Sequence, residues 1–84
     1  MNTVTSTTST IELPQLNFGD SGGAVRFLQQ VLVLRYCHKS VTVNGQFDET
    51  TQAAVKEFQG WNGLVPNGIV GELTWQALGR YISA

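Results

Sequence analysis

Asn44-Gly45-Gln46-Phe47-Asp48-Glu49-Thr50-Thr51 is matched 23 residues later by Asn67-Gly68-Ile69-Val70-Gly71-Glu72-Leu73-Thr74, and this repeat is the strongest indication of the fold. Each copy opens with Asn-Gly, a pair that tolerates the positive φ of a tight turn. A short apolar stretch and a helix start follow in both copies. The sequence therefore predicts a turn–helix unit that is used more than once.

A second pattern, found three times, marks the helices themselves. Ala is followed by an aliphatic residue and, three positions further on, by a larger apolar residue, starting at Ala24, Ala54 and Ala77. This spacing places apolar side chains on one helix face. The pattern predicts an all-α module of three helices. The expected helices are 22–36, 49–59 and 72–81.

The ends of the chain differ in composition from its middle. Residues 1–10 are dominated by Ser and Thr and are expected to form a flexible tail or linker, so that 11–84 is the domain. Within the domain, 11–18 reads as an extended arm that lays apolar side chains on the helices. The start has neither a basic n-region nor an apolar h-region, so no secretory signal is expected in this chain. The expected location is the cytoplasm for a complete protein, and the cell envelope or periplasm for part of an exported one.

Composition excludes several classes of function. The chain has 84 residues, 42% of them hydrophobic and 13% charged, and a formal net charge of −1. Without a basic run, binding to nucleic acid or to an anionic membrane is not expected. One cysteine cannot form an internal disulfide.

Catalytic and metal-binding constellations are also missing from the sequence. His38 and its neighbour Cys37 fall short of a zinc ligand set, and both are interpreted as surface or boundary residues. The carboxylates of Asp48, Glu49 and Glu72 stand at helix starts, where capping explains them better than acid–base chemistry. We therefore expect no catalytic residue, no metal and no cofactor.

Six fragments in order resemble the peptidoglycan-binding domain 1 family over about residues 13–80. The fragments are Leu16-x-Phe18-Gly19-Asp20-Ser21-Gly22, Val25-x-x-Leu28-Gln29-x-x-Leu32, Asn44-Gly45-x-Phe47, Thr51-x-x-Ala54-Val55-x-x-Phe58-Gln59, Gly63-Leu64-x-x-Asn67-Gly68-Ile69-Val70-Gly71 and Thr74-Trp75-x-Ala77-Leu78. The resemblance implies a compact orthogonal three-helix bundle. It also implies a noncatalytic module that binds peptidoglycan and accompanies a cell-wall hydrolase. Prodomains of metalloproteases share similar folds, so a protein-interaction or prodomain role is the alternative.

The sequence departs from the family pattern at the turns and helix starts. Asn44 and Asn67 replace the frequent Asp before Gly, Asp48-Glu49 replaces Gly-Pro, and Glu72 replaces Pro. Because Asn suits these turns as well as Asp, the fold should survive. A cation or ammonium contact in a groove would be weakened.

The expected ligand site surrounds the second turn. Aromatic faces beside amide groups suit sugars and peptide amides, so Trp61 and Trp75 are expected to stack on the ligand. The hydrogen-bonding groups and the glycine that permits close approach would be Gln59, Asn67, Thr74 and Gly68. A core position is the alternative for both tryptophans, and a local backbone bond is the alternative for Thr74. The expected partners are peptidoglycan and a cell-wall hydrolase domain, and the domain is expected to be a monomer.

Overall fold

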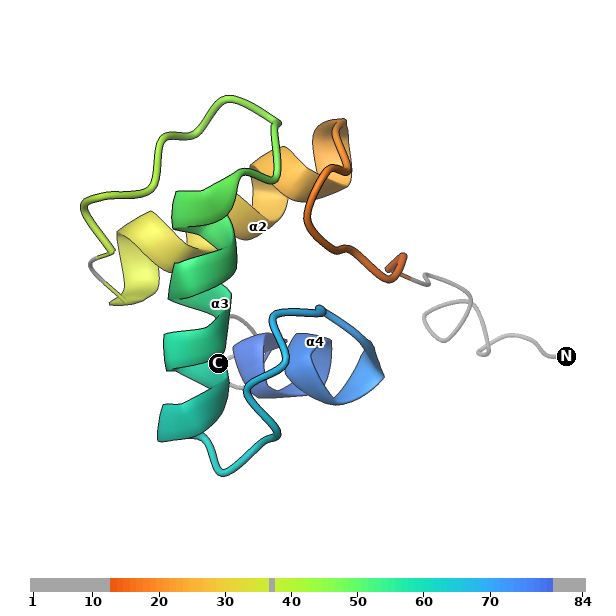
Figure 1. The fold of residues 1–84 in the computed structure, drawn as a ribbon, viewed down its shortest axis with the longest axis vertical. Helices are drawn as coiled ribbons and strands as arrows, with labels where there is room; N and C mark the ends of the chain where they lie inside the picture. Colours follow the sequence, from red (N-terminus) through yellow and green to blue (C-terminus); the bar gives the residue numbers. More distant parts are fainter. Residues whose placement is uncertain (1–12, 37, 80–84) are drawn as a thin grey trace, which may run out of the picture.

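The computed structural model describes residues 13–36 and 38–79, and these contain three helices. They are α2 (Gly23–Tyr36), α3 (Glu49–Trp61) and α4 (Glu72–Gly79). Figure 1 shows α2 crossing the upper half of α3, with α4 beside its lower half. The predicted all-α three-helix bundle is confirmed. The predicted tail, 1–10, and the predicted last two residues of the third helix lie outside the described residues.

Helix α3 runs two residues further than predicted and then stops at a left-handed glycine. Gly63 has φ +73°, its N–H donates to the Gly60 carbonyl at 3.2 Å, and the Leu64 N–H donates to the Gln59 carbonyl at 2.8 Å. This pair of bonds is the Schellman arrangement, which satisfies carbonyls at a helix C-terminus. Gly60 is the last but one residue of the helix.

The core is built from one face of each of the three helices. Val25, Leu28 and Leu32 of α2 and Phe58 of α3 are fully buried, as is Leu78 of α4. Burying such side chains removes them from water and supplies most of the folding free energy of a small domain. The remaining members of this cluster are Leu16, Val31, Val41, Phe47, Ala54, Val55, Val70, Trp75 and Ala77.

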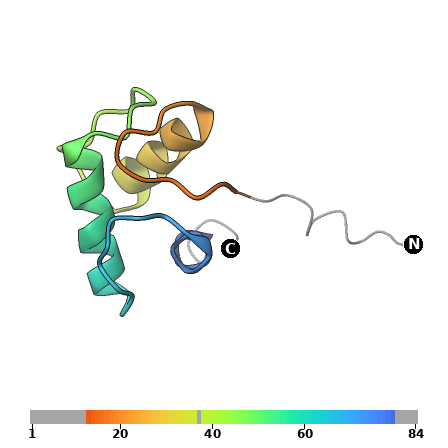
Figure 2. The same cartoon turned by 45° about the vertical axis from the view of Figure 1, so that its right-hand side comes forward.

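The arm before α2 joins both copies of the repeated stretch. Leu16 and Val70 exchange two backbone hydrogen bonds, of 3.0 and 2.8 Å, and the Phe47 N–H donates to the Asp20 carbonyl at 2.9 Å. Figure 2 shows the arm running alongside the segment before α4. The predicted arm is confirmed for Leu16, which is buried, whereas Leu13 and Phe18 stay 44% and 54% exposed. Ile11 lies outside the described residues.

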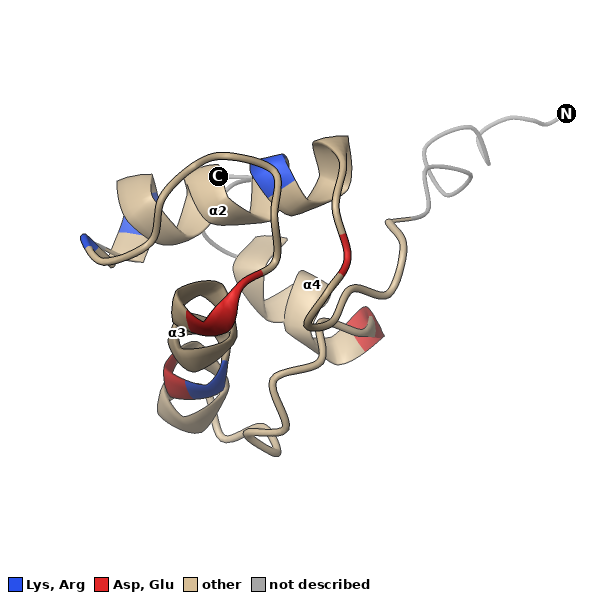
Figure 3. Ribbon diagram, turned by 45° about the horizontal axis from the view of Figure 1, so that its top comes forward, with Lys and Arg blue, Asp and Glu red and all other residues tan. Residues whose placement is uncertain are grey.

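Charged side chains are spread over the surface without a basic cluster among the described residues. Figure 3 shows acidic residues at the starts of α3 and α4 and basic residues mainly along α2 and just after it. None of the described helices is long and apolar enough to cross a membrane.

Candidate ligand-binding site

The first turn unit, residues 44–51, is held by a glutamine from α2. The Gln29 side chain is fully buried, and its Nε2 donates to the Gln46 carbonyl at 2.8 Å and to Thr51 Oγ1 at 3.0 Å. Its Oε1 accepts from the backbone N–H groups of Asn44 and Gly45 at 3.0 and 2.8 Å. Nε2 also approaches Asn44 Oδ1 at 3.2 Å. One amide therefore bonds three backbone groups of this turn.

The second turn unit, residues 67–74, repeats this arrangement with Gln59 of α3. Gln59 Nε2 donates to the Ile69 carbonyl at 2.9 Å, to Thr74 Oγ1 at 3.0 Å and to Asn67 Oδ1 at 3.1 Å. Its Oε1 accepts from the Gly68 N–H at 2.9 Å. Four residues of the predicted ligand site thus lie together, but they bond to one another. A direct ligand contact by Gln59, Asn67, Gly68 or Thr74 stays a prediction.

The glycine of each turn unit is required by its backbone conformation. Gly45 and Gly68 have φ +80° and +78°, values that L side chains rarely adopt. At Gly68 a Cβ would also lie 3.0 Å from Gln52 Cγ and 3.1 Å from Lys56 Cε. The close approach predicted at Gly68 is therefore an approach of α3 side chains to the turn.

Helix α3 begins with the predicted Asp48 cap. Asp48 Oδ1 accepts from the Thr51 N–H at 3.0 Å and from the Thr50 and Thr51 hydroxyls, each at 2.9 Å. These bonds, above all the one from the Thr51 backbone, favour the carboxylate and lower the pKa of Asp48 below its usual value. Such bonding is that of a capping group rather than a proton donor.

Trp75 lies in the core cluster rather than on an open face. Its side chain is 8% exposed, its Nε1 donates to the Pro14 carbonyl at 2.8 Å, and its ring stacks on Phe27 with centroids 6.0 Å apart. Thr74, Ala77 and Leu78 are buried beside it, and the arm and α2 cover the edge that Trp75 occupies. A stacking role for Trp75 toward a ligand stays a prediction.

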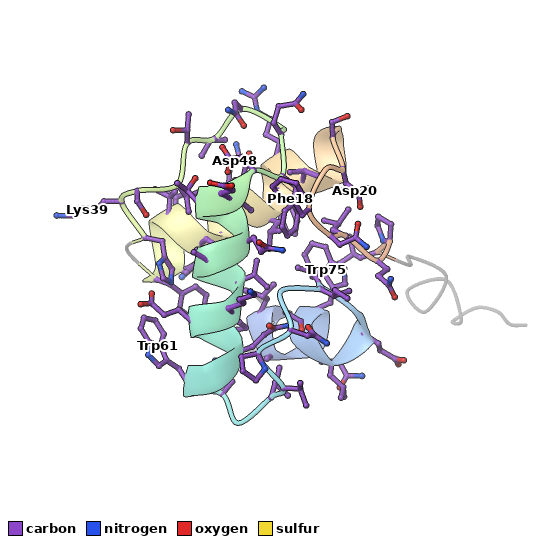
Figure 4. The ribbon with its side chains drawn as sticks, viewed as in Figure 1. Phe18, Asp20, Lys39, Asp48, Trp61 and Trp75 are labelled. Atoms are coloured by element: carbon purple, nitrogen blue, oxygen red, sulfur yellow. The ribbon has the colours of Figure 1, made fainter. Side chains whose placement is uncertain are left out.

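Trp61 is the exposed aromatic residue of the predicted set. Its side chain is 63% exposed and stacks on His38, with centroids 5.4 Å apart and ring planes 16° apart. Figure 4 shows Trp61 and Trp75 on opposite sides of α3. Trp61 also follows Gln59 by two residues, about 200° around a helix. The structure therefore does not bring the six predicted residues into one patch.

His38 is the main correction to the sequence interpretation. It was expected at the surface or boundary, but its side chain is 8% exposed beneath the Trp61 ring. Cys37 lies outside the described residues. Gln29 stands in one of the six sequence fragments but not among the predicted site residues, although the match of Leu28-Gln29 to Phe58-Gln59 could have revealed its role.

A shallow depression lies at the other end of α3. It has a volume of about 500 Å³, and its walls include the exposed Phe18 ring and the start of α3. The remaining lining residues are Gln46, Phe47, Asp48, Glu49 and Thr50. Within 13–36 and 38–79, no group of three or more His, Cys, Asp or Glu side chains is placed to hold a metal ion.

These features define a small helical module whose polar side chains mainly build its turns. A family model described as a putative peptidoglycan binding domain matches residues 21–78, which include both turn units, α2, α3 and all of α4 except its last residue. The chain belongs to this family.

Two curated relatives support the assignment over part of their length. The chain is 40% identical over 65 residues to a zinc D-Ala-D-Ala carboxypeptidase of Streptomyces albus G, covering 75% of this chain and 25% of that protein. It is 46% identical over 65 residues to an uncharacterized protein of Kitasatospora aureofaciens, and this match covers 77% of this chain and 55% of that protein. The chain thus spans about half or less of the curated relatives it matches.

Two solved structures share the fold. The SleB N-terminal domain is matched with a TM-score of 0.74 and 30% identity, over 86% of this chain and 97% of that one. A peptidoglycan-binding protein from Clostridioides difficile, in complex with glutamine hydroxamate, is matched with a TM-score of 0.74 and 36% identity. This match covers 82% of this chain and 42% of that one.

Proposed function

We propose that this domain is a noncatalytic module that binds bacterial cell-wall peptidoglycan and localises an attached or partner hydrolase. The observation that carries the proposal is the family match over residues 21–78. A peptidoglycan-binding protein among the structural matches and a carboxypeptidase among the relatives support it. The module would act at the cell envelope as a monomer.

The proposed contact with the ligand is the exposed Trp61 ring. A flat aromatic face presents an apolar surface to the C–H groups of a sugar or the plane of a peptide. With 63% of the side chain exposed and His38 on one face, the other face is available. The Gln59 network would act behind this contact by fixing the end of α3 and the second turn unit.

A noncatalytic role is supported by the bonding of the polar groups. The Asp48 carboxylate is engaged in capping, and the buried amides and hydroxyls of Gln29, Gln59, Thr51 and Thr74 bond within the turn units. The affinity for peptidoglycan through one neutral aromatic contact would be modest. A tether to a hydrolase would raise it through effective concentration.

Sedimentation with purified insoluble peptidoglycan tests this function. Trp61→Ala should abolish most retention while the domain stays folded in urea unfolding, because the ring is mostly exposed and its removal loses only the stacking on His38, about 0.5–1.5 kcal/mol. Phe18→Ala is the matched control, since Phe18 is an exposed aromatic at the opposite end of α3. Loss with Phe18→Ala alone would move the contact to the depression. No retention of the folded parent would favour the protein-interaction role.

A further inference from the structure

The imidazole beneath Trp61 is buried, and one of its nitrogens lacks a hydrogen-bond partner within the described part of the chain. His38 is 8% exposed, and its Nε2 has no hydrogen-bond partner among the described residues. Its ring lies nearly parallel to the Trp61 ring, at 16° and 5.4 Å between centroids. Buried polar atoms are usually satisfied, so an orphaned nitrogen beneath an exposed aromatic ring calls for a physical explanation.

The backbone fixes where this imidazole can lie. The His38 N–H donates to the Leu32 carbonyl at 3.2 Å, and the Val41 N–H donates to the His38 carbonyl at 3.1 Å. The segment after α2 is therefore folded back on the helix end. His38 can leave the Trp61 ring mainly by turning its side chain.

Charged groups surround the imidazole unevenly. From α3, Glu57 Oε1 lies 3.5 Å from His38 Nδ1, and the Glu57 side chain is 60% exposed. Arg35 stands in the last turn of α2, and Lys39 follows His38 in the chain. Figure 4 shows Lys39 pointing away from the domain. Glu57 is thus the charged group in contact with the ring, and of the two neutral tautomers it favours the one with its proton on Nδ1.

Protonation would add an N–H at the buried Nε2. Among the described residues Nε2 has no hydrogen-bond partner, and a buried donor without a partner costs free energy. The ion pair with Glu57 stabilises the imidazolium only a little, because the Glu57 side chain is exposed and water screens the pair. Histidine is the side chain that ordinarily changes charge between about pH 5 and 8.

We propose that neutral His38 is a positioning residue for Trp61, and that protonation turns the imidazole out and frees the indole. Trp61 would then be a rigid stacking surface at neutral pH and a mobile one in acid. The coupling to ligand rests on the proposed function, whereas the movement of the ring does not.

Acrylamide quenching of tryptophan fluorescence tests the movement without any ligand. From pH 8 to pH 5 the quenching constant of Trp61 should rise roughly twofold, because its covered face opens to solvent. Trp61→Phe leaves the buried Trp75 as the background. His38→Phe keeps an aromatic ring that cannot titrate, so its quenching should not change with pH. If His38→Phe does not fold, His38→Leu serves as the variant that cannot titrate. Quenching in the parent that is constant with pH, or that falls in acid, overturns the proposal, as does an unchanged pH response in the non-titrating variant.

Sedimentation with peptidoglycan at the two pH values tests the coupling. Retention of the parent should fall several-fold at pH 5, and His38→Phe should be retained equally at both. Equal retention of the parent at both pH values would overturn the coupling. No retention at either pH would overturn the proposed function together with the coupling, and the quenching result would then decide the movement alone.

Discussion

The two turn units have the same hydrogen-bond network but differ in what surrounds it. In both, a buried glutamine bonds to an asparagine, a carbonyl and a threonine hydroxyl. Fifteen positions separate Gln29 from Asn44, but only eight separate Gln59 from Asn67. The extra residues lie within 30–43 and include His38. The hydrogen-bond network is the same in both units although the number of residues between glutamine and asparagine differs. This indicates that the fold depends on the network and not on the length of the connecting segment.

The helix starts differ as well. Asp48 caps α3 with three hydrogen bonds to its Oδ1, whereas the equivalent position before α4 is Gly71, which has no side chain. The first turn unit is therefore bonded more completely than the second. We expect the same substitution to be more costly in the first turn unit than in the second.

Removing the glutamines should have the largest effect. Gln29→Leu and Gln59→Leu leave buried backbone and hydroxyl groups without partners, at about 1–3 kcal/mol for each group. Gln29 accepts from two N–H groups and Gln59 from one, so Gln29→Leu should cost more, roughly 3 kcal/mol or above. Urea unfolding measures both.

Exposed glutamines provide the matched controls for these substitutions. Gln30→Leu on α2 and Gln76→Leu on α4 change the same chemical groups at the surface and should stay within about 0.5 kcal/mol of the parent. Equal costs at Gln29 and Gln30 would show that the network does not hold the turn.

Removing the hydroxyl acceptors should have a smaller effect that separates the two units. Thr74→Val loses the acceptor for Gln59, at about 1 kcal/mol. Thr51→Val also loses the bond to the Asp48 carboxylate, so about 2 kcal/mol is expected. Thermal and urea unfolding of the two variants should rank them in this order. The reverse order would contradict the claim that the first turn unit is bonded more completely.

Much of the fold could be predicted because local patterns and packing agree. The three helices, the Asp48 cap and the buried face of Val25, Leu28 and Leu32 follow from periodicity and capping chemistry. The Asn-Gly repeat located both turns, because positive φ has a strong sequence signature.

The candidate site was less predictable because burial depends on distant segments. Trp75 stands at the edge of its helix stripe, yet Pro14 and Phe27 cover it from far along the chain. His38 is buried because the segment after α2 folds back toward Trp61. A polar pattern also cannot distinguish an amide that meets a ligand from one that satisfies a turn, as Gln59 shows.

The Asp48 cap makes the first turn unit sensitive to acid. Asp48→Ala should cost about 1 kcal/mol at pH 7, as is usual for loss of an N-cap. Because folding lowers the pKa of Asp48, its ionisation stabilises the domain above the ordinary carboxyl range near pH 4. That contribution is lost as the pH falls through the lowered pKa. Urea unfolding from pH 7 to pH 2 should show the parent and Asp48→Ala converging in acid, and a constant difference would contradict this role.

Giving the second turn unit the missing cap is the smallest change and the closest test of the comparison. A Cβ at Gly71 would meet no heavy atom within 4 Å, and its φ lies outside the left-handed region. Gly71→Asp should therefore place a carboxylate before α4 without strain and stabilise the domain by about 0.5–1 kcal/mol. Gly71→Ala is the control, since it gives only the smaller gain from a less flexible unfolded chain. Urea unfolding at pH 7 should give the highest free energy of unfolding for Gly71→Asp, a lower one for Gly71→Ala and the lowest for the parent. If Asp and Ala are equal, the second turn unit lacks the cap geometry of the first, and the likeness between the two units ends at the glutamine network.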